Sequence, residues 1–390
     1  MLNPAAPMRP GEAVETPWLS RLMRARSGDE LRAALLSAQA GFDPATLKRV
    51  AILGAAKEGG RLAQICRSRG IDVAAIADDD PNKTGTTLEG FPVRPSSELD
   101  ALARDTPIVI ASHRVTQACE RLKKSGFVHV APFAALQVLD PIAFPPHMFY
   151  DRWLDDLWVN RARYGRFRDM LTDDQSLRVL DTILGYRQTL DPAVFGRVVR
   201  WDLYGPNGLL RLGDDEVYVD GGSYDGDTVR LFVDRVAGRF DRVLAFEPDR
   251  QNFTRLKANF AAEPRIETFN AGLYREHAVL RFRADGSRDA TFFADGTEDM
   301  DVVALDEVLK GDRVTYIKMN IEGAEIDALK GAAGSIARWT PKLAIAVYHR
   351  PSDLWQIAEV VRGLNPNYDL YLRQHDGGVI ETVLYALPRP

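Results

Sequence analysis

Residues 217–228 read VYVDGGSYDGDT, and this stretch decides the fold of the C-terminal half of the chain. A short apolar, β-branched run ends at Asp220, passes into a glycine-rich turn and is followed by a helical pattern. Glycines at a strand-to-helix turn let the backbone approach a ligand closely, beside a helix N-terminus. The stretch therefore predicts the first strand of a parallel α/β sheet that binds a ligand at its carboxyl end.

The same alternation of strands and helices continues through residues 213–390. The predicted strands are EVYVD (216–220), DRVLAFE (241–247), RIETFN (265–270), VTYIKMN (314–320) and LAIAVYH (343–349). A polar insert over 275–305 holds three strand-like pieces, AVLRFRAD (278–285), TFFAD (291–295) and MDVVAL (300–305). Residues 368–387 alternate on either side of Asp376-Gly377-Gly378, which predicts a terminal antiparallel hairpin.

The first part of the chain predicts a second α/β unit over residues 48–140. Its strands are KRVAILGA (48–55), IDVAAIADDD (71–80), TPIVIAS (106–112) and FVHVAP (127–132), with helical patterns between them. Residues 1–47 predict a loose tail and surface helices. Residues 141–212 predict a helical connector, with helices over 172–190 and 191–204 and mostly buried aromatic residues. The fold class is thus α/β, with two Rossmann-like doubly wound sheets joined by helices.

Composition excludes several classes of protein. The chain has 390 residues, of which 45% are hydrophobic and 27% charged, and a formal net charge of −5. These values are those of a globular protein and argue against nucleic acid as a partner. No apolar run approaches the ~20 residues of a membrane helix, and the N-terminus has no apolar signal region. The two cysteines, Cys66 and Cys119, are far apart in the sequence and form no CxxC pattern, which fits a reducing cytoplasm. The sequence is compatible with a homo-oligomer.

The turn after the first strand is acidic. Asp220, Asp225 and Asp227 crowd it, and three carboxylates would repel the pyrophosphate of a dinucleotide. They suit a ligand that carries an ammonium and a sulfonium group, which is S-adenosylmethionine. The alternative is that Asp227 or Thr228 only caps the helix and that Asp225 is solvated.

A second acidic position follows at the end of the next strand. Glu247 lies 27 residues after Asp220, where an acid can accept hydrogen bonds from ribose hydroxyls. Pro248 directly after it prevents the strand from continuing. The alternative is an ordinary acid at a helix start.

Further polar residues gather at the end of the fourth strand of this half. Lys318, Asn320, Glu322 and Glu325 lie where open α/β sheets place their ligands. Glu322 and Glu325 could bind a divalent ion, but carboxylates near a helix start are commonly partners of the helix dipole, so no metal is predicted. His349 ends the fifth strand, where a histidine is commonly a structural hydrogen-bond donor and can also titrate near neutral pH.

With these motifs the chain resembles the FkbM family of S-adenosylmethionine-dependent methyltransferases. The resemblance covers residues 213–390 and rests on VDGGSYDGDT (219–228), AFEPD (245–249), FNAGL (269–273), VALDEVL (303–309) and YIKMNIEGAEIDALKGA (316–332). It implies a class I methyltransferase fold and O-methylation of a sugar, a glycan precursor or a related hydroxyl. Asn320 departs from the family, which usually has Asp there; Asn keeps the acceptor oxygen but loses the charge.

The resemblance also implies roles for individual residues. The methionine part and its loop would be held by Asp220, Gly221, Gly222, Ser223, Tyr224, Gly226 and Thr228. Glu247 would hold the ribose, and Asn270 and Ala271 would lie near the adenine. His349, with Lys318, Asn320 and Glu322 as further candidates, would serve alignment and proton removal.

The first unit carries a degenerate glycine turn over residues 54–60, with Ala56 where a dinucleotide motif has its second glycine. Lys57 adds positive charge, and Asp78 ends the second strand. The region resembles the nucleotide-sugar-binding domain of PglD-type sugar acetyltransferases, which implies a sugar nucleotide on this turn. The alternatives are a degenerate domain kept for packing, an NAD(P)-linked oxidoreductase or epimerase, and a non-catalytic binding protein.

Overall fold

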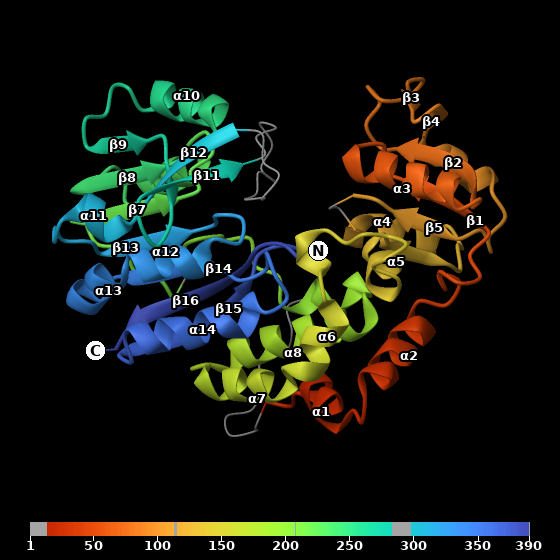
Figure 1. Cartoon of the computed structure of the whole chain (residues 1–390), viewed down its shortest axis with the longest axis horizontal. Helices are drawn as coiled ribbons and strands as arrows, with labels where there is room; N and C mark the ends of the chain where they lie inside the picture. Colours follow the sequence, from red (N-terminus) through yellow and green to blue (C-terminus); the bar gives the residue numbers. More distant parts are fainter. Residues whose placement is uncertain (1–13, 113–114, 207, 283–297, 390) are drawn as a thin grey trace. The chain divides into compact units, whose positions relative to one another are not determined.

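The computed structural model describes residues 14–112, 115–206, 208–282 and 298–389 (Figure 1). The chain divides into two compact units. The N-terminal unit comprises Met1–Arg166, Leu177–Val199 and Asp376–Ile380; the C-terminal unit comprises Phe167–Ser176, Arg200–His375 and Glu381–Pro390. The connector predicted over 141–212 is thus shared between the two units. Of the tail predicted over residues 1–16, residues 1–13 lie outside the described residues, and so do the piece TFFAD (291–295) and the last three residues of AVLRFRAD (278–285).

The N-terminal unit is built on a six-stranded sheet of order β3-β4-β2-β1-β5-β6, parallel except for the β3–β4 pair. Its strands are β1 (Arg49–Leu53), β2 (Asp72–Asp78), β3 (Thr87–Leu88), β4 (Phe91–Pro95), β5 (Ile108–Ile110) and β6 (Val130–Pro132). Its helices include α1 (Pro17–Arg24), α2 (Gly28–Ala38), α3 (Lys57–Ser68), α4 (Val115–Lys124) and α5 (Ala134–Leu139). The predicted parallel sheet is confirmed, but the β3–β4 hairpin was missed because it is short and polar.

The residues of the predicted connector form α6 (Trp153–Val159), α7 (Arg161–Met170) and α8 (Asp174–Thr189). The Asp173 carboxylate accepts from the Ser176 amide and so caps α8. The helix predicted over 191–204 is wrong: only a 3₁₀ turn forms at η3 (Pro192–Arg197), started by Asp191. The predicted burial of aromatics holds for Trp153, at 2% exposure, whereas Trp201 is 80% exposed.

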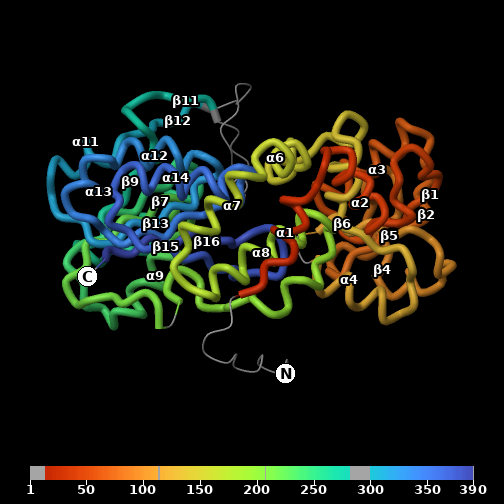
Figure 2. Tube along the Cα trace, turned by 90° about the horizontal axis from the view of Figure 1, so that it is seen from below, coloured from red at the N-terminus to blue at the C-terminus, as the bar shows by residue number. Residues whose placement is uncertain are grey.

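The C-terminal unit contains a seven-stranded sheet of order β15-β16-β14-β13-β7-β8-β9 (Figure 1). The strands are β7 (Val217–Gly221), β8 (Arg242–Phe246), β9 (Ile266–Phe269), β13 (Tyr316–Met319), β14 (Lys342–Ala346), β15 (Tyr368–Gln374) and β16 (Thr382–Pro388). All pairs are parallel except those of β16, which runs antiparallel to both β14 and β15. The predicted hairpin is therefore present, and Figure 2 shows the β15 and β16 traces side by side.

Helices connect these strands, and a small second sheet holds part of the predicted insert. The helices are α9 (Asp227–Arg235), α10 (Arg250–Asn259), α11 (Leu305–Leu309), α12 (Glu325–Gly331), α13 (Ala333–Trp339) and α14 (Asp353–Leu364). The small sheet has the order β10-β12-β11, from β10 (Gly272–Leu273), β11 (Ala278–Phe282) and β12 (Glu298–Val303). Among the described residues, none of the helices has the length and apolar character needed to cross a lipid bilayer.

The strand order places the candidate site. The chain starts the sheet at β7, adds β8 and β9 on one side, and returns to add β13 on the other. Loops after β7 and β13 therefore diverge, and the crevice between them is where open α/β sheets bind ligands. Beneath it Tyr218 stacks on Phe232 and Tyr316, with ring centroids 4.4 and 4.8 Å apart, which fixes both strands.

Candidate active site

A pocket lies at the carboxyl ends of β7, β8 and β13. It is lined by Leu203, Tyr204, Gly222, Tyr224, Asp227, Thr228, Glu247, Pro248, Asn252, Gly272, Leu273, Lys318, Asn320, Ile321, Glu322 and Glu381. Polar groups from separate segments thus converge on one cavity within the C-terminal unit.

The turn between β7 and α9 forms one wall of the pocket. Gly222 has φ +77°, and a Cβ there would lie 2.0 Å from the carbonyl oxygen of Asn320, so only glycine fits. The amides of Gly222 and Ser223 donate to the carbonyl of Phe246, and the Ser223 hydroxyl donates to that of Asp220. The turn is therefore fixed in a shape that brings its backbone against the cavity.

Glu247 follows β8 and faces this turn. Its carboxylate accepts from the backbone amides of Tyr224 (2.8 Å) and Asp249 (2.9 Å). Burial, which leaves the residue 6% exposed, raises the pKa of Glu247 to about 7, although the two amides act to lower it. The group is thus a buried acceptor at the position predicted for the ribose hydroxyls.

Asp220 and Lys318 form a buried ion pair beneath the turn. The Lys318 ammonium is 2.8 Å from Asp220 Oδ1 and also donates to the carbonyls of Gly221 and Gly222. The Thr228 hydroxyl donates to the second Asp220 oxygen. Burial raises the pKa of Asp220 and Lys318 opposes that effect. Lys318 therefore neutralises Asp220 and ties the turn to β13.

The acidic turn differs from its predicted electrostatics. Asp220 is fully buried against Lys318, and Asp225 pairs with Arg230 at 2.9 Å. Asp227 alone of the three lines the pocket. One carboxylate, rather than three, is thus placed to meet a cationic ligand from this turn.

The opposite end of the pocket holds Asn320, Glu322, Glu381 and Tyr204. The Tyr348 hydroxyl donates a hydrogen bond to the Asn320 side-chain oxygen at 3.2 Å. The amide therefore still acts as an acceptor here, although it lacks the charge of a carboxylate. Glu322 lies in the turn after β13 with φ +55°, and its side chain is 19% exposed. Hydroxyl, amide and carboxylate groups therefore surround this end of the pocket.

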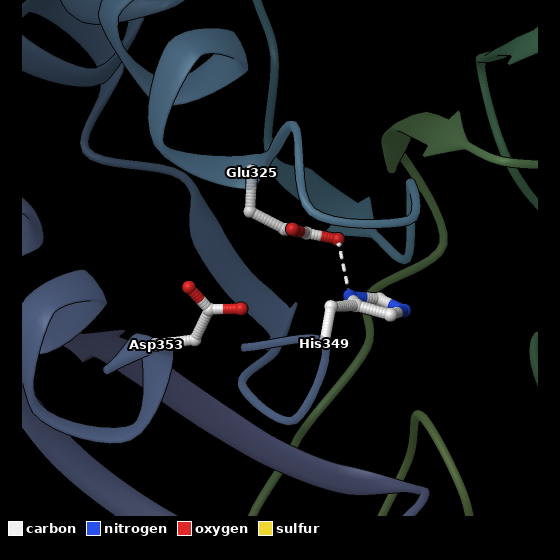
Figure 3. Close-up of side chains that lie close together, drawn as sticks. All are labelled: Glu325, His349 and Asp353. Carbon is white, nitrogen blue, oxygen red and sulfur yellow. Dashed lines mark ion pairs between the residues drawn. The ribbon is translucent and has the colours of Figure 1, made fainter. Parts of the chain in front are cut away.

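Behind Glu322 lies a buried group of three side chains, Glu325, His349 and Asp353 (Figure 3). His349 Nδ1 is 2.9 Å from Glu325 Oε1, and His349 Nε2 is 3.6 Å from Glu322 Oε1. Burial acts to lower the pKa of His349, but Glu325 and Glu322 outweigh it and hold that pKa well above its ordinary value. Burial, then Glu325, raises the pKa of Asp353 to about 7.

These three residues are also where a metal ion would have to be considered. Within the described parts of the chain, one ligand atom from each comes within 4.8 Å of the others. The carboxylates of Glu325 and Glu322 raise the pKa of His349, so an imidazolium paired with Glu325 is one way to balance the buried negative charge, and a bound cation is the other.

Comparison with known proteins agrees with this geometry. Residues 220–376 match the family model described as the methyltransferase FkbM domain. Residues 220–376 form an FkbM methyltransferase domain. The resemblance read from the motifs is confirmed, and S-adenosylmethionine is the cofactor of such a domain. The cradle at Gly222 and the buried acceptor Glu247 fit that cofactor.

A crystal structure of methyltransferase FkbM from Methylobacillus flagellatus KT is similar over both units. The TM-score is 0.73 and the identity 25%, and the likeness covers 95% of this chain and 97% of that one. Shorter matches are found to redox-sensing transcriptional repressors: 33% identity over 92 residues to Rex of Streptomyces coelicolor, and 28% over 101 residues to Rex 2 of Enterococcus faecalis. They cover 22% and 24% of this chain, and 36% and 47% of those proteins.

The FkbM domain brings seven of the predicted residues to the pocket: Gly222, Tyr224, Thr228, Glu247, Lys318, Asn320 and Glu322. The other seven lie outside its lining: Asp220, Gly221, Ser223, Gly226, Asn270, Ala271 and His349. Several of these support lining residues. Asn270 donates to the carbonyls of Glu247 and Pro248, and His349 is fully buried and reaches the pocket only through Glu322.

Several residues at the end of the pocket opposite the glycine turn carry no sequence motif. Leu203 and Tyr204 come from the predicted connector, and Glu381 comes from the loop of the terminal hairpin. No motif marks them, because they reach the pocket through long-range packing. Asn252, at the start of α10, could have been suspected from its place just after Glu247.

Proposed function

We propose that the protein is an S-adenosylmethionine-dependent O-methyltransferase whose acceptor is a hydroxyl of a sugar, a glycan precursor or a related small molecule. The observation that carries the proposal is the pairing of a cofactor cradle, formed by Gly222 and Glu247, with the carboxylates of Glu322 and Glu381 in the same pocket. Such groups bind hydroxyls and can accept their protons.

When bound, the cofactor supplies a methyl group on a sulfonium, which is already a good leaving group. The chain therefore has to align the acceptor and remove its proton. Glu247 would hold the ribose, and Asp227 would meet the ammonium group. Lys318 and Asp220 act on the shape of the turn and not on the acceptor, because both are buried in their own ion pair.

The N-terminal unit is proposed to hold a nucleotide sugar near residues 54–60. Gly54 has φ +119°, and a Cβ at Gly59 would lie 1.9 Å from the Gly54 carbonyl oxygen, so the turn packs closely on α3. In this proposal the N-terminus of α3 and Lys57 would meet a phosphate of the ligand. The Cys66 and Cys119 thiols are free and buried, which supports a cytoplasmic protein.

The test combines binding and turnover with the full chain. S-Adenosylhomocysteine titrated calorimetrically should bind at one site, and Glu247→Gln should weaken that binding. A panel of sugars and nucleotide sugars, screened for thermal stabilisation, should yield an acceptor that gains one methyl group by mass analysis. Absence of S-adenosylhomocysteine binding would disprove the methyltransferase proposal; a methylated nitrogen in place of oxygen would correct the acceptor class.

A further inference from the structure

Glu322 occupies a conformation that needs local support. It is a non-glycine residue with φ +55°, in the turn between β13 and α12, and it lines the acceptor end of the pocket. Left-handed backbone of this kind persists only where neighbouring contacts determine it, and it is often found at functional sites. The contacts that determine it come from the buried group behind the turn.

Glu325 fixes that turn from two directions. Its Oε1 accepts from the Ile321 amide at 2.8 Å, directly before Glu322, and lies 2.9 Å from His349 Nδ1. Glu325 Oε2 is buried and forms no hydrogen bond among the described residues. The carboxylate thus holds both the backbone in front of Glu322 and the imidazole behind it, as Figure 3 shows for the latter.

His349 joins this buried carboxylate to the pocket. Its Nε2 is 3.6 Å from Glu322 Oε1, while the Tyr348 ring lies 4.4 Å from its own, centroid to centroid. The groups facing it are Glu322 from the turn, Glu325 from α12 and Asp353 from α14. Asp353 in turn accepts from the Arg350 amide at 2.8 Å. An imidazolium here is therefore held between two carboxylates, one buried and one at the pocket.

We propose that Glu322 is the general base of the transfer, and that His349 and Glu325 are positioning residues that hold its carboxylate toward the acceptor. The inference rests on the proposed function. The acceptor O–H bond breaks and its proton passes to a Glu322 oxygen. The acceptor oxygen forms its new bond to the methyl carbon as the carbon–sulfur bond breaks, and that electron pair stays on sulfur.

The proposed base, Glu322, lies between the pocket and His349, which was the base expected from the sequence. His349 is fully buried and absent from the pocket lining, so it does not meet the acceptor. It contacts the Glu322 carboxylate from behind, at 3.6 Å, and so acts on the position of that carboxylate. Asn320, without a carboxylate charge, leaves Glu322 as the nearest acid in this segment.

The test compares single substitutions in the full chain. Glu322→Gln should lower kcat about 10²–10⁴-fold, the usual contribution of a general base, with S-adenosylhomocysteine affinity unchanged. Glu322→Asp should restore part of the rate. His349→Gln should lower kcat less than Glu322→Gln does and leave KM unchanged, because it removes the contact behind Glu322 but leaves the carboxylate itself. Full activity in Glu322→Gln, or a loss in Glu381→Gln alone, would overturn the proposal.

A spectroscopic measurement separates this inference from the proposed function. The histidine ¹⁵N resonances of the wild-type protein should show His349 as imidazolium across the neutral range, and Glu322→Gln should shift them. Unchanged resonances would overturn the positioning contact even if no acceptor were found. One zinc ion bound per chain, lost in Asp353→Asn but kept in the exposed control Asp301→Asn, would also overturn it. Binding of S-adenosylhomocysteine without turnover on any acceptor would count against the proposed function instead.

Discussion

In both units an acidic side chain at the end of a strand accepts a hydrogen bond from a glycine turn, but the charges around the two acids differ. In the N-terminal unit, Asp78 at the end of β2 accepts from the Ala55 amide in the glycine turn at 2.6 Å. In the C-terminal unit, Glu247 just after β8 accepts from the Tyr224 amide at 2.8 Å. Both turns also rely on a glycine at positive φ, Gly54 and Gly222.

The partners of the two acids differ. Asp78 also pairs with Lys83 at 3.0 Å; burial raises its pKa, but the amides and Lys83 outweigh that and hold the pKa below its ordinary value. Glu247 forms no ion pair among the described residues, its pKa is raised to about 7 by burial, and it lines a pocket. The position of an acid at a strand end therefore does not by itself indicate a binding site. Glu247 differs from Asp78 in lining a pocket and in having no cationic side chain as its partner among the described residues.

The largest expected effect concerns the cation of each turn. Lys318→Met should destabilise the protein by about 3–5 kcal/mol, because it leaves Asp220 buried and unpaired at 0% side-chain exposure. Lys83→Met, whose side chain is 36% exposed, should cost below about 1 kcal/mol. Urea unfolding of both variants measures the difference. Equal losses would show that the two turns depend on their cations alike.

The next effect concerns the glycine of the cofactor turn. Gly222→Ala should lose about 1–3 kcal/mol more stability than Gly238→Ala, because its Cβ would meet the Asn320 carbonyl. Gly238 is a matched control, with φ +72° and no atom within 4 Å of an added Cβ. Gly222→Ala should also abolish S-adenosylhomocysteine binding in calorimetry. Retained binding would mean that the cradle does not touch the cofactor.

The acids themselves come third. Glu247→Gln should weaken S-adenosylhomocysteine binding about 10- to 100-fold, since hydrogen bonds to a charged group contribute about 1.5–3 kcal/mol. Asp78→Asn, the equivalent change in the N-terminal unit, should leave that affinity unaltered. Calorimetric titration compares them. A similar loss in both variants would contradict the assignment of the site to the C-terminal unit.

Sequence and structure agree where local pattern decides the outcome. The glycine turn, Glu247 and the β7-to-β14 alternation follow from strand periodicity and from residues that end strands, so they could be predicted. The surroundings of each acidic side chain could not be predicted from the sequence. Whether Asp220 faces a ligand or Lys318 depends on the side-by-side pairing of β7 and β13, which is set by strand order.

The end of the pocket that contains Tyr204 and Glu381 was even harder to predict from the sequence. Tyr204 and Glu381 lie in segments without periodicity and reach the pocket from more than a hundred residues before and about sixty after β13. Likewise, His349 ends its strand as expected, yet β14 and the turn after β13 bury it completely. Spacing along the chain predicts which edge of the sheet a residue reaches, and packing decides whether it meets the ligand.

The smallest effect is a pH dependence that distinguishes the two acids. In the proposed complex the ribose hydroxyls donate to the ionised form of Glu247, so S-adenosylhomocysteine affinity should rise about tenfold between roughly pH 6 and pH 8, around a pKa of about 7. Asp78 contributes nothing in this window, because its pKa is lowered.

The stability of the free protein should depend on pH in the opposite direction from the ligand affinity. A folded-state pKa raised above its ordinary value of 4.5 contributes stability that is present below that value and lost as pH rises through about 7. Ligand affinity and free-protein stability should therefore move in opposite directions across neutral pH. Glu247→Gln should flatten the affinity profile and remove its share of the stability change; an affinity profile unchanged in that variant would assign the titration to another group.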